Sequence, residues 1–271
     1  MSLKQNTTAE SADASVPEDV ILYTEDLTKR FGDLVAVSSV DLQIESGDVY
    51  SVIGPNGAGK TTLFNLITGW LSPSRGRVVF DGTDVTDYPA HERVQRGMTR
   101  SFQITNVFEG LTVQENVRLA VQSAEYPSMG TRETLLWGTD RFEEIERRTK
   151  DVLAQVELLD RADMRANEMA YGDKRRLEVG LILATDPALV LLDEPTAGMS
   201  SDETNETIDL ITDVLADRTL LVVEHDVDLV MNISDRIIAL NYGEVIAQGT
   251  PTEIANDDAV QEAYLGSDHD R

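Results

Sequence analysis

The sequence contains no cysteine, which excludes a disulfide framework, a thiol nucleophile and a thiolate zinc site. Nothing in the composition therefore indicates an oxidising compartment, and the cytoplasm is the expected location. Long apolar runs are missing as well. Uninterrupted apolar stretches such as residues 188–192 and 220–223 have the length of a strand, far below the roughly 20 residues that span a bilayer.

Lysine is also scarce. The chain has 23 basic residues, only five of them lysines, against 49 acidic residues, and its formal net charge is −26. An acidic surface repels nucleic-acid phosphates and anionic headgroups, so neither autonomous nucleic-acid binding nor a polybasic membrane anchor is expected. The acidic excess and the preference for arginine over lysine together favour adaptation to a salt-rich cytoplasm, where self-repulsion is screened.

The 271 residues are 41% hydrophobic, too apolar for a disordered chain and sufficient for one large domain or a core with a subdomain. The N-terminus differs from the rest. It is polar and has no apolar stretch of the kind found in signal sequences, so residues 1–18 are predicted to form a disordered leader.

Short apolar runs alternate with helical patterns along most of the chain. The runs predict strands at residues 20–23, 49–53, 77–80, 188–192, 219–223 and 236–240. The last three hardly alternate between apolar and polar residues, as is typical of parallel strands buried on both faces. Residues 202–216 show the amphipathic pattern of a helix that covers a sheet. The alternation predicts an α/β fold.

Two regions depart from this alternation. Residues 105–169 have no strand pattern, and they predict a helical insertion because apolar residues recur there at helical spacing: Phe142, Ile145, Val152, Val156 and Leu159. Near the N-terminus, residues 41–53 and 76–81 resemble hairpin-forming strands with glycine turns. They predict a separate antiparallel β region.

The strand at residues 49–53 leads into a phosphate-loop pattern, G-x-x-x-x-G-K-[ST], with a helical pattern after it. Its glycines allow backbone N–H groups to point at phosphate oxygens at the positive end of that helix. Lys60 is expected to contact the β and γ phosphates, and Thr61 to offer its hydroxyl to Mg²⁺. The predicted nucleotide-binding residues are Gly54, Pro55, Asn56, Gly57, Ala58, Gly59, Lys60, Thr61 and Thr62.

A second acidic element follows the apolar run at residues 188–192. A buried parallel strand that ends in Asp193 and Glu194 delivers two carboxylates to the edge where open α/β sheets bind ligands. Asp193 is the expected Mg²⁺ ligand, and Glu194 the group that polarises an attacking water. His225 follows another buried strand, so it is expected at the same edge, whereas Gln103 taken alone carries no assignment.

In order and spacing, these motifs resemble the ATPase subunit of ATP-binding cassette (ABC) transporters over residues 21–249. The resemblance implies an α/β phosphate-loop (RecA-like) ATPase core with an antiparallel β subdomain and an inserted helical subdomain. It places the ATPase domain at residues 19–250, with the helical subdomain at about 105–169, and a C-terminal helical tail at 251–271. It also implies ATP and Mg²⁺.

The resemblance implies further site residues. Gln103 would contact Mg²⁺ and water and link the core to the helical subdomain, His225 would contact the γ phosphate, and Phe31 would stack on adenine. The catalytic set is then Lys60, Gln103, Glu194 and His225, and the metal set is Thr61, Gln103 and Asp193. Residues 197–200 fall where the family has a loop that crosses between two subunits.

The family signature, usually Leu-Ser-Gly-Gly-Gln, is altered here. It appears as Met169 followed by Ala170, Tyr171, Gly172 and Asp173, before a helix predicted at residues 174–184. Ala170 has no hydroxyl to donate to the γ phosphate of a facing subunit, and Tyr171 replaces a glycine. Backbone donors and the helix dipole remain, so hydrolysis is expected to be weakened but not abolished.

The altered signature, together with the EHD sequence at residues 224–226 and EAYLG at 262–266, resembles the ATPases of branched-chain amino acid importers. That type implies a second, different ATPase subunit, transmembrane permease subunits, an extracellular solute-binding protein reached indirectly, and a peripheral location on the cytoplasmic face of the membrane. Urea and short-amide importers remain an alternative, and Ala170 leaves open a low-activity regulatory partner. A soluble cassette acting on nucleic acid or ribosomes fits neither the single cassette nor the charge.

Overall fold

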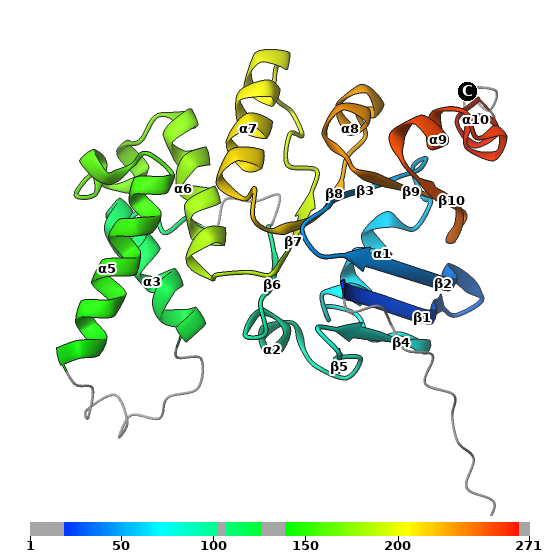
Figure 1. Cartoon of the computed structure of the whole chain (residues 1–271), viewed down its shortest axis with the longest axis horizontal. Coiled ribbons are helices and arrows are strands. Elements are labelled where there is room, and N and C mark those ends of the chain that lie inside the picture. The colour runs from blue at the N-terminus through cyan, green and yellow to red at the C-terminus, as the bar shows by residue number, and fades with distance from the viewer. Residues whose placement is uncertain (1–18, 102–106, 126–138, 266–271) are drawn as a thin grey trace, which may run out of the picture.

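The computed structural model describes residues 19–101, 107–125 and 139–265 (Figure 1). The strands are β1 (Val20–Phe31), β2 (Leu34–Glu45), β3 (Val49–Ile53), β4 (Arg75–Phe80), β5 (Thr83–Asp84), β6 (Met98–Arg100), β7 (Leu189–Asp193), β8 (Thr219–Val223), β9 (Arg236–Asn241) and β10 (Glu244–Gly249). The α-helices are α1 (Lys60–Ile67), α2 (Ala90–Val94), α3 (Val113–Glu125), α5 (Thr139–Gln155), α6 (Tyr171–Ala184), α7 (Ser201–Val214), α8 (Val227–Ile233), α9 (Pro251–Ala255) and α10 (Asp258–Leu265).

The strands form two sheets. One has the order β10-β9-β3-β8-β7-β6 and is parallel except for β10, which pairs with β9 in the antiparallel sense. The other has the order β2-β1-β4-β5 and is antiparallel. The predicted α/β core with an antiparallel region is therefore confirmed, and β3, which precedes the phosphate-loop sequence, lies inside the parallel sheet.

The central parallel strands are buried on both faces, as their uniform apolar sequence predicts. Every residue of β7 and β8 is buried. Leu189 and Leu191 face α1 and the antiparallel sheet, whereas Val190 and Leu192 belong to the cluster formed with α6 and α7. Because a fully buried leucine or valine contributes roughly 1.5–3 kcal/mol, these strands hold the two layers together.

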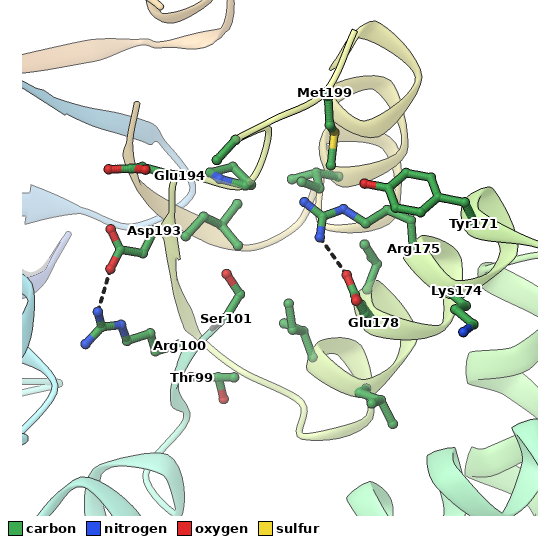
Figure 2. A pocket seen from close by; sticks show the side chains of 17 residues that line it. Thr99, Arg100, Ser101, Tyr171, Lys174, Arg175, Glu178, Asp193, Glu194 and Met199 are labelled. Carbon is green, nitrogen blue, oxygen red and sulfur yellow. Dashed lines mark hydrogen bonds and ion pairs between the residues drawn. The ribbon is translucent and has the colours of Figure 1, made fainter. Parts of the chain in front are cut away.

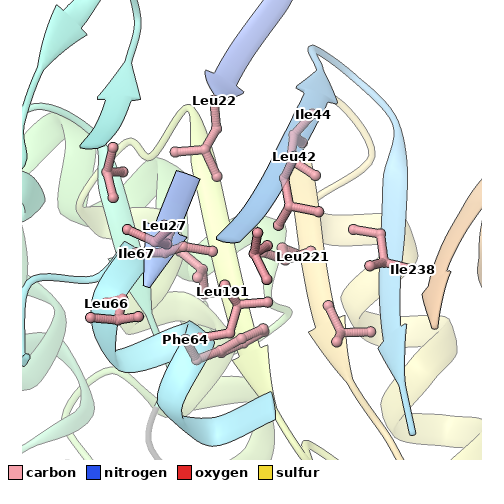
Figure 3. Packing of buried hydrophobic residues seen from close by; sticks show 14 of the residues in the cluster. Leu22, Leu27, Leu42, Ile44, Phe64, Leu66, Ile67, Leu191, Leu221 and Ile238 are labelled. Carbon is pink, nitrogen blue, oxygen red and sulfur yellow. The ribbon is translucent and has the colours of Figure 1, made fainter. Parts of the chain in front are cut away.

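The first core cluster positions the helix of the phosphate loop. Figure 3 shows Phe64 and Ile67 of α1 in one cluster with Leu27 of β1 and with Leu191 and Leu221 of the parallel sheet. All five side chains are completely buried. The N-terminal end of α1 is therefore fixed relative to the ends of β7 and β8.

A fully buried arginine holds the other end of α1. The guanidinium of Arg93, which is 1% exposed, donates to the carbonyls of Leu66, Ile67, Thr86 and Tyr88 at 2.5 to 3.0 Å. Burial lowers the pKa of Arg93 to about 10, against the opposing effect of two aspartates, so the group is charged at neutral pH. It satisfies carbonyls at the negative end of the helix that have no partner within the helix.

Helices α3, α5 and α6 lie together at the side of the molecule away from β1 and β2 (Figure 1). The helical insertion predicted from apolar spacing is thus confirmed in the described part of residues 105–169. Ile145, Val152 and Val156 are buried in its core. Phe142 and Leu159, which belong to the same apolar pattern, are instead 52% and 46% exposed.

The hairpin predicted across residues 41–53 is wrong. Strand β2 pairs with β1, whereas β3 pairs with β8 and β9, so the turn between β2 and β3 carries the chain from one sheet to the other. The glycine turn alone cannot distinguish these two paths. The second predicted hairpin is confirmed, since β4 pairs with β5 across Asp81 and Gly82.

The C-terminal helices cover the edge of the parallel sheet. Residues of α9 and α10 form a third cluster with Ile53 at the end of β3. The Tyr264 hydroxyl hydrogen-bonds the backbone of Gly54; burial raises the pKa of this hydroxyl and the hydrogen bond opposes the rise. None of the helices in the described ranges is long and apolar enough to cross a bilayer.

Candidate nucleotide site

The phosphate-loop sequence forms a tight connection between β3 and α1. Gly57 and Gly59 have φ values of +83° and +104°, in the left-handed region that favours glycine. A Cβ atom on Gly54 would lie 2.1 Å from the carbonyl oxygen of Leu240, and one on Gly59 would lie 2.5 Å from that of Ala36. The loop therefore requires glycine where the backbone approaches its neighbours.

The remaining loop residues leave a polar backbone surface. Ala58 N donates to Pro55 O at 3.1 Å and closes a turn, and Asn56 is exposed. Helix α1 starts at Lys60 without a side-chain cap, so no side chain occupies its first N–H groups. Thr61 is exposed and Thr62 half-buried at this end. Such a helix start is suited to bind phosphate.

Lys60 is buried and folds back over the loop. Its Nζ donates to Gly54 O at 2.6 Å and to Pro55 O at 3.2 Å. Burial lowers its pKa, and the charges of Glu194 and Asp193 oppose that shift. The two carboxylates predicted from the strand end therefore lie beside the loop, where they offset the lysine charge.

Asp193 is held by an arginine that sequence reasoning missed. Arg100, at the end of β6, donates to Asp193 Oδ2 at 2.5 Å (Figure 2). It also donates to Asn65 Oδ1 at 2.6 Å. The ion pair is largely buried. The arginine could have been suspected from its position three residues before Gln103, but only the pairing of β6 with β7 brings it to Asp193.

Glu194 and His225 meet although they are 31 positions apart. His225 Nε2 lies 2.8 Å from Glu194 Oε1. The backbone of Glu194 is in the left-handed region, with φ +49°, and its N–H donates to Val223 O at 2.9 Å. Non-glycine residues in this region are uncommon and cluster at functional sites. The expected convergence of these strand ends is confirmed.

The residues present fit Mg²⁺. Among the described residues no three His, Cys, Asp or Glu side chains form a group that could hold a metal ion. Mg²⁺ does not need such a cage, because it is usually bound by one or two carboxylates together with waters and substrate phosphates. Thr61 at the start of α1 and the Asp193 carboxylate beside the loop supply that kind of donor set.

The described contacts do not bring Phe31 into this group. Phe31 lies at the end of β1, 48% exposed, with the Lys29 ammonium 5.3 Å from its ring centroid. The ring is partly open to solvent, and the described contacts do not link it to Lys60. Gln103 lies outside the described residues.

The altered signature forms the open N-terminus of α6. Ala170 is the N-cap and provides no side-chain hydrogen bond. Tyr171 is 59% exposed, and a Cβ on Gly172 would meet nothing within 4 Å. Asp173 forms an ion pair with Arg161. The first backbone N–H groups of this helix are therefore accessible from outside.

A cavity of about 520 Å³ separates the signature from the carboxylates. Figure 2 shows Asp193 and Glu194 on one side of it and Tyr171 and Lys174, on α6, on the other. Within α6, Arg175 pairs with Glu178 at 2.6 Å. The signature residue Tyr171 therefore lies across a cavity from the Asp193 and Glu194 carboxylates of the same chain.

Comparisons with known proteins agree with this geometry. The family model described as "ABC transporter" matches residues 37–197, and one described as "Branched-chain amino acid ATP-binding cassette transporter" matches residues 244–270. The chain is similar to the high-affinity branched-chain amino acid transport ATP-binding protein BraF of Pseudomonas aeruginosa. The two are 39% identical over 253 residues, covering 91% of this chain and 98% of the relative.

LivG of Escherichia coli, described in the same words, is 38% identical over 250 residues, covering 91% of this chain and 98% of the relative. Among solved structures, the ADP conformation of an ATP-binding cassette of an ABC transporter has a TM-score of 0.75 and 30% identity. That match covers 91% of this chain and 99% of the cassette. The chain therefore belongs to the ABC transporter family, as one of its ATP-binding proteins.

Proposed function

We propose that this chain binds and hydrolyses ATP to power the import of branched-chain amino acids through a membrane permease. One observation carries the ATPase assignment: Lys60 on a glycine loop, Asp193, and the Glu194–His225 pair converge at the same edge of the parallel sheet. The solute is inferred from the similarity to BraF and LivG, since no residue described above contacts a transported molecule.

Catalysis would rest on positioning and charge neutralisation. Lys60 would exchange its bonds to Gly54 and Pro55 for contacts with the β and γ phosphates. Glu194 would orient and deprotonate the attacking water. His225, which contacts the Glu194 carboxylate, would reach the γ phosphate. Mg²⁺, held by Thr61, Asp193 and Gln103, would neutralise phosphate charge. The exposed ring of Phe31 would stack on adenine.

The position of α6 supports a two-subunit site. The signature residues Ala170, Tyr171, Gly172 and Asp173 would bind the nucleotide of a facing ATPase subunit, which in this family type is a different chain. Permease subunits would receive the motion through the helical region, and an extracellular solute-binding protein would act indirectly. The protein would sit peripherally on the cytoplasmic face of the membrane.

Transport assays test the function and its nearest alternative. Deletion of the gene should abolish uptake of radiolabelled leucine, isoleucine and valine, and the intact gene should restore it. Uptake of radiolabelled urea should be unchanged. Loss of urea uptake instead would assign the chain to a urea or short-amide importer. Absence of ATPase activity even with the partner subunit would leave a regulatory nucleotide-binding role.

Replacing Ala170 by serine should raise ATP hydrolysis up to about tenfold, because the new hydroxyl could donate to the γ phosphate of the facing subunit. Serine would also cap α6, which is worth about 1 kcal/mol. Ala170→Gly separates the two effects, since glycine also caps better than alanine but has no hydroxyl. Steady-state ATPase rates and melting temperatures of the reconstituted pair provide the measurement. An equal rate gain in both variants would contradict the phosphate contact.

Melting temperature should rise from dilute buffer to molar KCl. The net charge is −26. Four exposed carboxylates lie on one face of α7, as the sequence predicts: Asp202, Glu206, Asp209 and Asp213. At molar ionic strength the screening length falls to about 3 Å, which removes most of the self-repulsion. NaCl at the same ionic strength should act similarly. An equal or higher melting temperature in dilute buffer would exclude adaptation to salt.

A further inference from the structure

A buried carboxylate that has no role in the mechanism above lies between the ends of β7 and β8. Glu224 directly follows β8 and is 5% exposed. Burying a charged carboxylate is costly unless hydrogen bonds replace its hydration. The two carboxylate oxygens of Glu224 must therefore accept hydrogen bonds from within the protein.

One oxygen of Glu224 binds a distant turn, and the other binds the next residue in the chain. Oε1 accepts hydrogen bonds from Thr196 N at 3.0 Å and from Thr196 Oγ1 at 2.7 Å. Oε2 accepts from His225 N at 3.2 Å. Thr196 is itself 8% exposed and lies two residues after Glu194. The carboxylate thus ties the turn that follows β7 to the end of β8.

This bridge encloses Glu194. On the N-terminal side, Glu194 N is bonded to Val223 O at 2.9 Å, and on the C-terminal side Thr196 is held by Glu224. Between these two points Glu194 adopts φ +49°, a conformation that costs an ordinary residue free energy. Such a backbone persists only where its surroundings hold it in place. The hydrogen bonds of Glu224 provide part of that restraint.

We infer that Glu224 is a positioning residue: it fixes the Thr196 turn to β8, so that the Glu194 carboxylate and the His225 imidazole meet at 2.8 Å before ATP arrives. The inference rests on the proposed roles of Glu194 and His225. Among the described residues, Glu224 hydrogen-bonds Thr196 and the His225 backbone, and it acts through these two. It also fixes the start of residues 197–200, the loop expected to cross to the facing subunit.

Glu224→Gln tests the bridge with little change in size. An amide has one acceptor oxygen, so its NH₂ group must face an N–H donor at Thr196 or at His225. We expect kcat for ATP to fall about tenfold with KM within about twofold, as for loss of one buried charged hydrogen bond. Thr196→Val should lower kcat by a similar factor. Thr196→Ser keeps the hydroxyl and should have a kcat close to that of the wild type.

A double variant separates a shared role from two independent ones. If Glu224 acts through Thr196, Glu224→Gln combined with Thr196→Val should be little slower than Glu224→Gln alone. Effects that multiply would overturn the inference, as would a Glu224→Gln enzyme with wild-type kcat. Melting temperatures of all variants identify any loss of folded protein.

A readout independent of hydrolysis keeps the inference distinct from the proposed function. The sequence has three histidines, so the imidazole C–H cross-peaks can be assigned with His91→Ala and His225→Ala. Glu224→Gln should move the His225 cross-peak and leave that of His91 in place. An unmoved His225 peak would overturn the positioning role. A moved peak in a protein whose Glu194→Gln variant still hydrolyses ATP normally would overturn the catalytic assignment alone.

Discussion

Replacing Glu194 by glutamine should slow ATP hydrolysis by about 100-fold while leaving ATP binding intact, because general-base catalysis contributes at least this much. Glutamine preserves the size of the side chain and can keep a contact with His225, but it cannot accept a proton from water. Phosphate release under steady state measures the rate. Binding of a fluorescent ATP analogue, with an affinity within about twofold of wild type, shows that the site is intact.

The matched control is Glu206→Gln. Glu206 is an exposed residue of α7, so its replacement removes the same charge without touching the site. This variant should hydrolyse ATP at the wild-type rate. Unchanged turnover in Glu194→Gln would show that Glu194 is not the general base. Loss of ATP binding would show that Glu194 acts in binding the nucleotide rather than in activating the water.

Arg93→Met should destabilise the folded protein by about 3 kcal/mol or more and lower its melting temperature by roughly 10 °C. Methionine fills similar space but removes the hydrogen bonds that the guanidinium donates to four carbonyls, including the buried ones of Leu66 and Ile67 at the end of α1. Thermal unfolding followed by circular dichroism measures the change. Because α1 carries the phosphate loop at its other end, ATP affinity should fall as well.

Arg96→Met controls for the loss of a positive charge. Arg96 is exposed, and its guanidinium stacks 4.3 Å from the ring centroid of Tyr88. Such a surface change should alter stability by less than about 1 kcal/mol. Arg93→Lys should destabilise almost as much as Arg93→Met, since an ammonium cannot reach carbonyls on four sides. Equal stabilities for Arg93→Met and Arg96→Met would refute this role for the buried guanidinium.

The buried parallel strands were the easiest part of the fold to predict. Strands β3 and β8 begin and end where the apolar runs predict, because strands covered on both faces need apolar residues throughout. Strand β1 extends to Phe31, well beyond the predicted residue 23. The apolar pattern missed this extension because the later half of the strand carries polar residues and register shifts. The predicted hairpin across residues 41–53 failed, since the choice of sheet depends on partners distant in sequence.

The candidate site likewise divides into residues that belong to a local sequence pattern and residues whose contacts depend on distant parts of the chain. Lys60, Asp193 and Glu194 could be predicted because each belongs to a local pattern of strand, loop and acid or lysine. The contacts of Arg100 and Glu224 could not be predicted, because the partner of a charged residue beside a strand is unknown until the sheet order is known. Their importance arises from pairing between β6, β7 and β8, whose sequences are far apart.

The central position of β3 also constrains how the protein can be synthesised. Its partners β8 and β9 are among the last strands to leave the ribosome, and Gly47 N bonds Thr219 Oγ1, 172 positions later. Until then the apolar strand has unpaired edges, a state prone to misassembly in a nascent chain. Contacts of such long range also slow folding. A chain terminated before β9 would therefore lack a strand that supports its phosphate loop. Only a chain whose translation is nearly complete would then bind nucleotide.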